Sequence, residues 1–233
     1  MLSARHLNAY YGRAHILFDI DLQVERGEVV VLLGRNGAGK STLLKSLIGL
    51  VRPSGGGVFF RGERIDGLEP FRIAQRGLGY VPEDRRIFTD LTVAENLEIG
   101  RRRGHASAAV WTPERLFALF PNLAEMRDRQ AARMSGGEQQ MLSIARTLMG
   151  NPECILLDEP SEGLAPVIVD QMSAAIRSLR AQGLSVLLSE QNLRFAAEVS
   201  DRAYIIERGR MRYSGGMAEL EVQEEVRAKY LAI

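Results

Sequence analysis

The sequence predicts an α/β fold with a parallel sheet, and three observations support this prediction. A glycine-rich loop, residues 34–42, stands between an apolar run, Val29 to Leu33, and a segment with helical apolar spacing, Leu43 to Leu50. Two further apolar runs, Cys154 to Leu157 and Val186 to Leu188, are short and continuous, as strands buried on both faces are. Polar residues follow both runs, at the sheet edge where open α/β folds bind ligands.

Length and composition fit one ordinary globular domain. The chain has 233 residues, of which 45% are apolar and 25% charged, and its 30 basic and 29 acidic side chains give no overall basic field, so no nucleic-acid partner is expected. No apolar run approaches the roughly 18 residues of a membrane span, and the N-terminal residues lack a signal-peptide pattern, so we expect a cytoplasmic chain. The single cysteine, Cys154, is expected in the core.

The glycine-rich loop has the G-x-x-x-x-G-K-[ST] spacing of a phosphate-binding loop. Its glycines let backbone N–H groups wrap an anion, and the helix that follows points its positive end at the phosphates. Lys40 is expected to reach the terminal phosphate oxygens, and the Ser41 hydroxyl to ligate Mg²⁺. Lysine occurs only three times in the chain, and no Asn-Lys-x-Asp element indicates a guanine nucleotide. The complete loop reads Gly34, Arg35, Asn36, Gly37, Ala38, Gly39, Lys40, Ser41 and Thr42.

The N-terminal segments predict an antiparallel sheet. Leu2 to Tyr11 and Ile16 to Val24 have partly alternating, β-leaning patterns, and Val58 to Phe60, after three glycines, reads as a further strand. Tyr10 and Tyr11 close the first segment, where an aromatic ring can stack on a purine base or pack on the core. The spacing of these residues alone favours packing of the tyrosine ring on the core.

A mainly helical region is predicted after the strand Gly79 to Val81, which Pro82 ends. Capping signals start helices at Thr92, with Glu95, and at Thr112, with Pro113. Arg101 to Ser107 reads as a solvated helix end and a flexible connection.

Ser135 and Glu138 have capping-box spacing, which places Gly136 and Gly137 at the positive end of the next helix. Glycine costs about 1 kcal/mol relative to alanine in a helix, so the pair is either merely tolerated or marks a close backbone approach to a group such as an anion.

Two carboxylates, Asp158 and Glu159, follow the strand Cys154 to Leu157. Asp158 suits Mg²⁺ or its water, and Glu159 suits the orientation or deprotonation of an attacking water. The alternative is that the pair only solvates a loop. The remaining chain predicts a helix from Pro166 to Gln182 and a buried strand from Val186 to Leu188, which Glu190 to Asn192 follow. A hairpin from Ala203 to Tyr213 and a helical tail from Met217 to Ile233 complete the predicted elements.

These segments together resemble the ATP-binding cassette (ABC) ATPases of transporters over essentially the whole chain. Three motifs occur in the family's order: residues 34–42, then Met134 to Gln140, then Cys154 to Glu159. The resemblance implies one cassette domain, 1–233, with a P-loop NTPase (RecA-like) core, an N-terminal antiparallel β subdomain and a helical subdomain at about 84–150.

The resemblance also implies a head-to-tail pair of cassettes. Ser135, Gly136, Gly137 and Glu138 of one subunit would then cover the ATP that lies on the phosphate loop of the other. Lys40, Ser41, Asp158 and Glu159 would act in cis, with ATP and Mg²⁺ as cofactors. Tyr11 matches the family's aromatic residue that stacks on adenine. The resemblance therefore favours stacking on the base over packing on the core at this position.

Three positions depart from the general family pattern. Glu83 stands where a glutamine is usual, Gln191 where a histidine is usual, and Ala165 where an aspartate is usual. Glu83 can still ligate Mg²⁺ or water, and Gln191 can still donate to the terminal phosphate. The same departures occur in the second ATPase subunit of branched-chain amino acid importers, which the segments 82–88, 161–166 and 190–192 resemble.

The expected function is that of an ATPase subunit, peripheral on the cytoplasmic face of the plasma membrane, in an importer for branched-chain or other hydrophobic amino acids. Its partners would be a second cassette, identical or not, the permease subunits and, indirectly, a solute-binding protein. Urea or short amides are alternative solutes. A weakly hydrolysing ATP clamp that acts as a binding module, and a soluble cassette of DNA repair or translation, are the alternatives from other classes.

Overall fold

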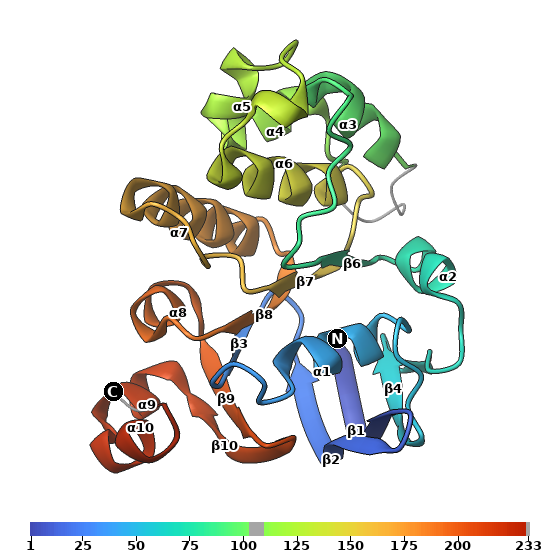
Figure 1. Cartoon of the computed structure of the whole chain (residues 1–233), viewed down its shortest axis with the longest axis vertical. Helices are drawn as coiled ribbons and strands as arrows, with labels where there is room; N and C mark the ends of the chain where they lie inside the picture. Colours follow the sequence, from blue (N-terminus) through green and yellow to red (C-terminus); the bar gives the residue numbers. More distant parts are fainter. Residues whose placement is uncertain (103–109, 232–233) are drawn as a thin grey trace.

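The computed structural model describes residues 1–102 and 110–231, and two sheets form the framework of that part of the chain (Figure 1). The larger sheet has the strand order β10-β9-β3-β8-β7-β6, and the smaller has β2-β1-β4-β5. The strands are β1 (Leu2–Tyr11), β2 (Ala14–Val24), β3 (Val29–Leu33), β4 (Gly55–Phe60), β5 (Glu63–Arg64), β6 (Leu78–Val81), β7 (Cys154–Asp158), β8 (Ser185–Glu190), β9 (Arg202–Glu207) and β10 (Arg210–Gly216).

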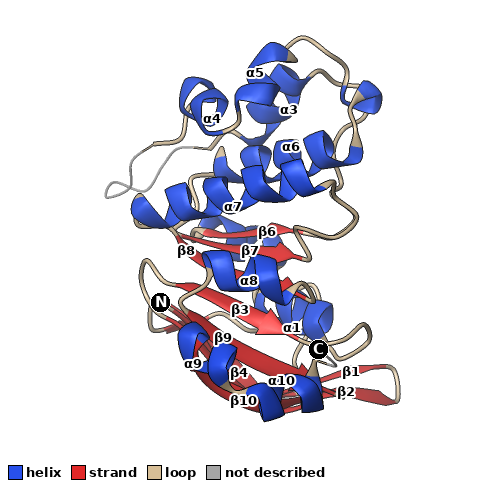
Figure 2. Cartoon of the chain, turned by 90° about the vertical axis from the view of Figure 1, so that its left-hand side faces the viewer, coloured by secondary structure: helices blue, strands red, loops and turns tan. Residues whose placement is uncertain are grey.

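The larger sheet is parallel from β6 to β9, and only its edge strand β10 is antiparallel. Its side chains alternate between two cores. Val30 and Leu32 of β3 pack with α1 and the smaller sheet, whereas Val29, Val31 and Leu33 pack with helices on the opposite face. Because both faces are covered (Figure 2), the parallel strands are apolar throughout, and the predicted α/β fold with a parallel sheet is confirmed.

The smaller sheet confirms the predicted antiparallel pair and extends the predicted further strand. The three glycines before Val58 form the first half of β4. The register between β1 and β4 is irregular between Arg5 and Asn8, and a Cβ on Gly56, whose φ is +80°, would stand 2.2 Å from the carbonyl oxygen of His6. Glycine is therefore required where this irregular part of β1 approaches β4.

Three helices begin at the predicted capping signals. Thr92 with Glu95 and Ser135 with Glu138 form complete capping boxes, and the Thr112 side chain caps the helix that starts at Pro113. The helices are α1 (Lys40–Leu47), α2 (Pro70–Gln75), α3 (Val93–Gly100), α4 (Pro113–Leu119), α5 (Pro121–Glu125), α6 (Gly136–Leu148), α7 (Pro166–Ala181), α8 (Leu193–Val199), α9 (Met217–Val222) and α10 (Glu224–Tyr230).

Helices α3 to α6 gather at one end of the molecule, beyond the edge strand β6 (Figure 1). Most of the predicted connection at 101–107 and the last two residues of the predicted tail lie outside the described ranges. None of the described helices has the length and apolar composition needed to cross a membrane.

Candidate nucleotide-binding and active site

The phosphate loop joins the carboxyl end of β3 to α1 at the centre of the larger sheet. Gly37 and Gly39 have left-handed backbones, with φ of +75° and +112°, and a Cβ on Gly34 would stand 2.5 Å from the carbonyl oxygen of Ile206. These positions therefore require glycine. Arg35, Asn36 and Gly37 are exposed, so the loop surface is open to a ligand.

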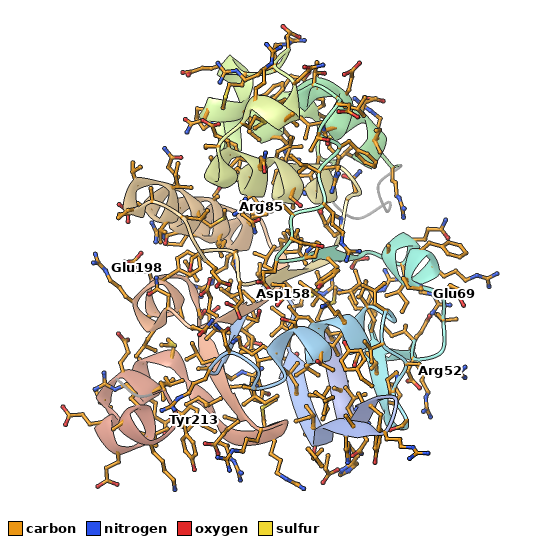
Figure 3. The ribbon with its side chains drawn as sticks, viewed as in Figure 1. Arg52, Glu69, Arg85, Asp158, Glu198 and Tyr213 are labelled. Atoms are coloured by element: carbon orange, nitrogen blue, oxygen red, sulfur yellow. The ribbon has the colours of Figure 1, made fainter. Side chains whose placement is uncertain are left out.

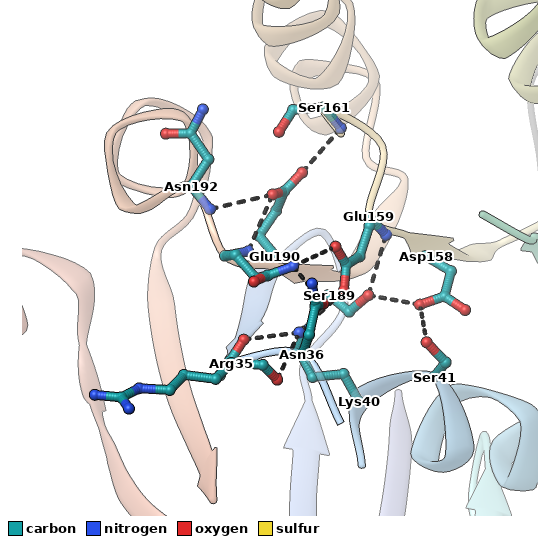
Figure 4. A network of polar contacts seen from close by, with 12 residues as sticks. Arg35, Asn36, Lys40, Ser41, Asp158, Glu159, Ser161, Ser189, Glu190 and Asn192 are labelled. Atoms are coloured by element: carbon teal, nitrogen blue, oxygen red, sulfur yellow. Dashed lines mark hydrogen bonds and ion pairs between the residues drawn. The ribbon is translucent and has the colours of Figure 1, made fainter. Parts of the chain in front are cut away.

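The Lys40 side chain is buried inside the loop. Its Nζ donates to the carbonyl oxygens of Gly34 (2.7 Å) and Arg35 (3.2 Å), and it lies 3.0 Å from Glu159 Oε1 (Figure 4). The ammonium group is thus held at the loop by acceptors that a phosphate oxygen can replace.

Asp158 accepts hydrogen bonds from three side chains of the site. It is 1% exposed, and its Oδ1 accepts hydrogen bonds from Ser41 Oγ (3.0 Å) and Ser189 Oγ (2.7 Å), while Oδ2 accepts from Tyr80 OH (3.1 Å). Burial, followed by the Asp158 charge, raises the pKa of Tyr80, so the phenol remains a donor.

The Ser41 hydroxyl and the Asp158 carboxylate present hard oxygen atoms side by side. Mg²⁺ prefers this donor chemistry, usually with one or two carboxylates completed by substrate phosphates and water. The two residues therefore fit a Mg²⁺ ion held jointly with a nucleotide.

Glu159 follows Asp158 with a left-handed backbone, φ 48°, which turns its side chain back toward the phosphate loop. Its N–H donates to Ser189 (Figure 4), and its Oε2 accepts a hydrogen bond from Gln191 Nε2 at 2.8 Å. Burial works to raise the pKa of Glu159, but hydrogen bonds from Glu162, Gln191 and Lys40 outweigh it and lower the pKa. An ionised carboxylate that is partly shielded from water suits a general base.

Glu162 is a second acid in contact with Glu159. Its hydrogen bond to Glu159 and, next, burial raise the pKa of Glu162 to about 7. Two neighbouring carboxylates repel when both are ionised, so the proton that the pair retains resides on Glu162.

Gln191 bridges the phosphate loop and the Glu159 carboxylate. Its Nε2 donates to Asn36 Oδ1 (2.6 Å) as well as to Glu159. The buried Glu190 carboxylate holds this turn in place, because it accepts hydrogen bonds from the backbone N–H groups of Ser161, Gln191 and Asn192.

The sequence-predicted residues thus divide into two groups. Residues 34–42, Asp158, Glu159 and Gln191 form one connected network. In the described ranges, no hydrogen bond or ion pair joins that network to Glu83, which is exposed, or to Tyr11, which is 49% exposed at the end of β1.

The residues at the start of α6 also lie apart from the network. Ser135 and Glu138 bond to each other in the capping box, a Cβ on Gly136 would meet Arg85, and one on Gly137 would meet Ile168. In Figure 1 the start of α6 belongs to the helical end of the molecule.

Sequence reasoning did not identify Tyr80, Ser189 and Glu162 as site residues. Ser189 is a polar side chain directly after the apolar run of β8, paired in register with Asp158, and this placement is a usable signal. Glu162 lies beyond the strand in a turn, and periodicity carries no information on its contact with Glu159.

Comparisons with known proteins agree with this geometry. The ABC transporter family model matches residues 17–162. The high-affinity branched-chain amino acid transport ATP-binding protein of Pseudomonas aeruginosa is 43% identical over 231 residues, 99% of both chains. The lipopolysaccharide export system ATP-binding protein of Haemophilus influenzae is 38% identical over 99% of this chain and 97% of its own.

A solved structure gives the same result for the fold. The nucleotide-free ATP-binding cassette of an ABC transporter superposes with a TM-score of 0.82 at 27% identity, over 95% of this chain and 93% of that one. The family match, the relatives that span nearly the whole chain and the fold agree, and the chain therefore belongs to the ABC transporter family, as one of its ATP-hydrolysing cassettes.

Proposed function

We propose that this cassette drives an importer of branched-chain amino acids, and that it does so as half of a head-to-tail pair of cassettes. The observation that carries the catalytic part is the position of Glu159, 3.0 Å from Lys40 and held by Gln191. Lys40 binds the terminal phosphate, and Glu159 then orients and deprotonates the water that attacks it.

The other site residues take roles set by their position. Ser41 and Asp158 would hold Mg²⁺, which would neutralise charge on the phosphates, and Glu83, on the loop after β6, would contribute to the metal or its water. Gln191 contacts the terminal phosphate, and Tyr11 stacks on adenine at the exposed end of β1. Ser135, Gly136, Gly137 and Glu138 complete the site of the second cassette.

Two findings support an amino acid as the solute: the name of a similar protein, and three short segments of this sequence. The Pseudomonas relative is named for branched-chain amino acid transport, and its 43% identity exceeds the 38% of the lipopolysaccharide export protein. The segments 82–88, 161–166 and 190–192 carry the departures that the importer branch shares.

The helical end of the molecule, at about 84–150, is the proposed contact with the permease subunits on the cytoplasmic face of the membrane. A cavity of about 250 Å³ opens between β6, α3 and α6, and the exposed side chains of Phe88 and Ile99 line it. An apolar side chain of a membrane subunit fits this position.

Uptake measurements test this function. In cells that lack the gene, we expect loss of labelled leucine and isoleucine uptake, restored by the wild-type chain but not by Glu159→Gln. Loss of urea or acetamide uptake instead would reassign the solute. Normal uptake of all four, with export of lipopolysaccharide impaired, would contradict the importer role.

A clamp that binds ATP without hydrolysing it is the competing function, since Gln191 replaces a proton-carrying histidine. The rate of ATP hydrolysis by the complex purified from membranes decides between a hydrolysing cassette and a clamp. Activity that survives in a complex whose partner cassette is disabled supports hydrolysis by this chain.

A further inference from the structure

The side chain of Arg85 lies on the first turn of α6. A Cβ built on Gly136 would stand 2.9 Å from Arg85 Nη1, and the Arg85 carbonyl oxygen accepts a hydrogen bond from Ser143 Oγ at 2.6 Å. Figure 3 shows Arg85 directly beneath α6. One residue of the loop after β6 therefore contacts α6 both at its start and two turns further on.

The charge of Arg85 is not neutralised there. Arg85 is half-buried, and in residues 1–102 and 110–231 its guanidinium has neither an ion pair nor a hydrogen bond, whereas its neighbour Arg86 pairs with Asp84 at 2.9 Å. The start of a helix is itself positive. The nearest acid of the helix, Glu138, is engaged by the Ser135 N–H in the capping box.

Gln140 provides an independent observation at the same turn. It is 2% exposed, yet neither Oε1 nor Nε2 has a hydrogen-bond partner in the described part of the chain. Gly136, Gln140 and Ser143 follow one another at i, i+4 and i+7, so Gln140 lies on the face that Arg85 contacts. Helical side chains lean toward the N-terminus, which directs the amide at the turn carrying Arg85.

The turn therefore combines a cation with free donors, a buried amide with a free acceptor, and the backbone N–H groups at the start of a helix. A guanidinium matches phosphate through two parallel hydrogen bonds. An amide oxygen behind the guanidinium can accept a hydrogen bond from one of its remaining N–H groups and so fix its orientation.

We propose that Arg85 is a further phosphate-contacting residue that acts in trans. Its guanidinium, braced by Gln140, contacts the terminal phosphate of the ATP that the second cassette holds. The inference rests on the proposed head-to-tail closure, which brings residues 135–137 over that phosphate and Arg85 with them.

The chain offers a matched control. Arg85 and Arg86 are adjacent and both have left-handed backbones, with φ of 62° and 49°, so alanine at either position meets the same backbone strain. Of these two arginines, it is Arg85 whose side chain lies against Gly136. Full-length Glu159→Gln protein, which we expect to retain bound ATP, is the background for both variants.

The readout is the ATP concentration that gives half-maximal dimer, measured by light scattering. We expect Arg85→Ala to raise it by about 10-fold or more, as loss of a charge-assisted phosphate contact does, and Arg85→Lys to have an intermediate effect. Arg86→Ala should change it by less than about 2-fold. ATP affinity of the monomer, measured separately, should be the same in all variants, because the phosphate loop acts in cis.

Gln140→Met, which keeps the side-chain volume, tests the brace. It should raise the same concentration, and its effect should largely disappear in the Arg85→Ala background because the two residues act as a unit. Equal behaviour of Arg85→Ala and Arg86→Ala, or a parallel loss of monomer ATP affinity, overturns the inference. If the Glu159→Gln parent stays monomeric at saturating ATP, the closure itself is wrong, and the inference falls with it.

Discussion

At the scale of single residues, Lys40 is the group whose interactions a bound triphosphate would change most. It bonds to two carbonyl oxygens of its own loop and pairs with Glu159. Under the proposed mechanism, a terminal phosphate would compete for the same ammonium group, and Glu159 would then be released toward the attacking water.

Replacement of Lys40 by alanine is therefore expected to abolish productive ATP binding. Loss of a charge-assisted contact of up to about 3 kcal/mol corresponds to a roughly 100-fold weaker affinity. Calorimetric titration with ATP measures it, and Lys45→Ala, on the same helix but outside the loop, is the control. Micromolar affinity retained by Lys40→Ala would argue against the phosphate-loop assignment.

Glu159→Gln should bind ATP normally but turn it over about 10² to 10⁴ times more slowly, the usual loss when a general base is removed. The amide keeps the size of the side chain and its hydrogen bond with Gln191. Single-turnover hydrolysis of labelled ATP measures the effect. An unchanged rate in this variant would refute the role given to Glu159.

The raised pKa of Glu162 predicts how the stability of the fold depends on pH. Its pKa is raised from 4.5 to about 7, first by the hydrogen bond to Glu159 and then by burial, so the folded chain binds this proton more tightly than the unfolded chain does. The stabilisation is complete below about pH 4.5 and is lost as the pH rises through about 7.

Urea midpoints across this range, compared between wild type and Glu162→Gln, measure that contribution. The wild-type midpoint should fall more steeply with pH than that of the variant. Parallel curves would show that Glu162 does not hold the proton.

How much of the site could be predicted varies from residue to residue. Lys40, Ser41, Asp158 and Glu159 were predicted because a phosphate loop and a strand end are local patterns. The contact between Glu162 and Glu159, and the bonds of Asp158 with Tyr80 and Ser189, arise only when turns and neighbouring strands come together in space. No local pattern encodes them.

At the scale of elements, the capping boxes fix where α3 and α6 begin. The Thr92 side chain accepts from the Glu95 N–H (3.2 Å), and Glu95 accepts from the Thr92 N–H (2.8 Å). Helix α3 packs on α6, so a stable start of α3 supports the helix that carries Gly136.

Thr92→Ala should lower the free energy of unfolding by about 1 kcal/mol, the typical cost of losing an N-cap, while ATP affinity stays unchanged. Thr92→Ser keeps the hydroxyl and should restore most of the difference. Thermal unfolding of the three proteins measures this, and equal midpoints would show that the cap contributes little.

Elements with strong local signals were predicted, and others were not. Pro70 and Asn192 are ordinary helix-start residues, but α2 and α8 are only 6 and 7 residues long, too short to show apolar periodicity. The glycine half of β4 was missed because its place in the sheet depends on the irregular register with β1. Tertiary pairing overrides local preference there.

At the scale of the whole molecule, the phosphate loop and the start of α6 belong to different parts of the fold. Lys40, Glu159 and Gln191 belong to one network, and within residues 1–102 and 110–231 no hydrogen bond or ion pair joins residues 135–138 to it. The central claim is that the site is completed between two cassettes, with each supplying a half to the other.

Complementation between two inactive variants tests this claim most directly. Lys40→Ala removes one half of the site. Gly136→Asp removes the other half, because its carboxylate repels phosphate, and the atoms nearest its Cβ belong to the flexible end of Arg85. Each variant alone should be inactive. In an equimolar mixture, half of the random dimers are mixed and contain one complete site, so ATPase activity should return to at most roughly a quarter of the wild-type rate. No recovery, in a mixture where differently tagged subunits are shown to associate, would contradict a site shared between two cassettes.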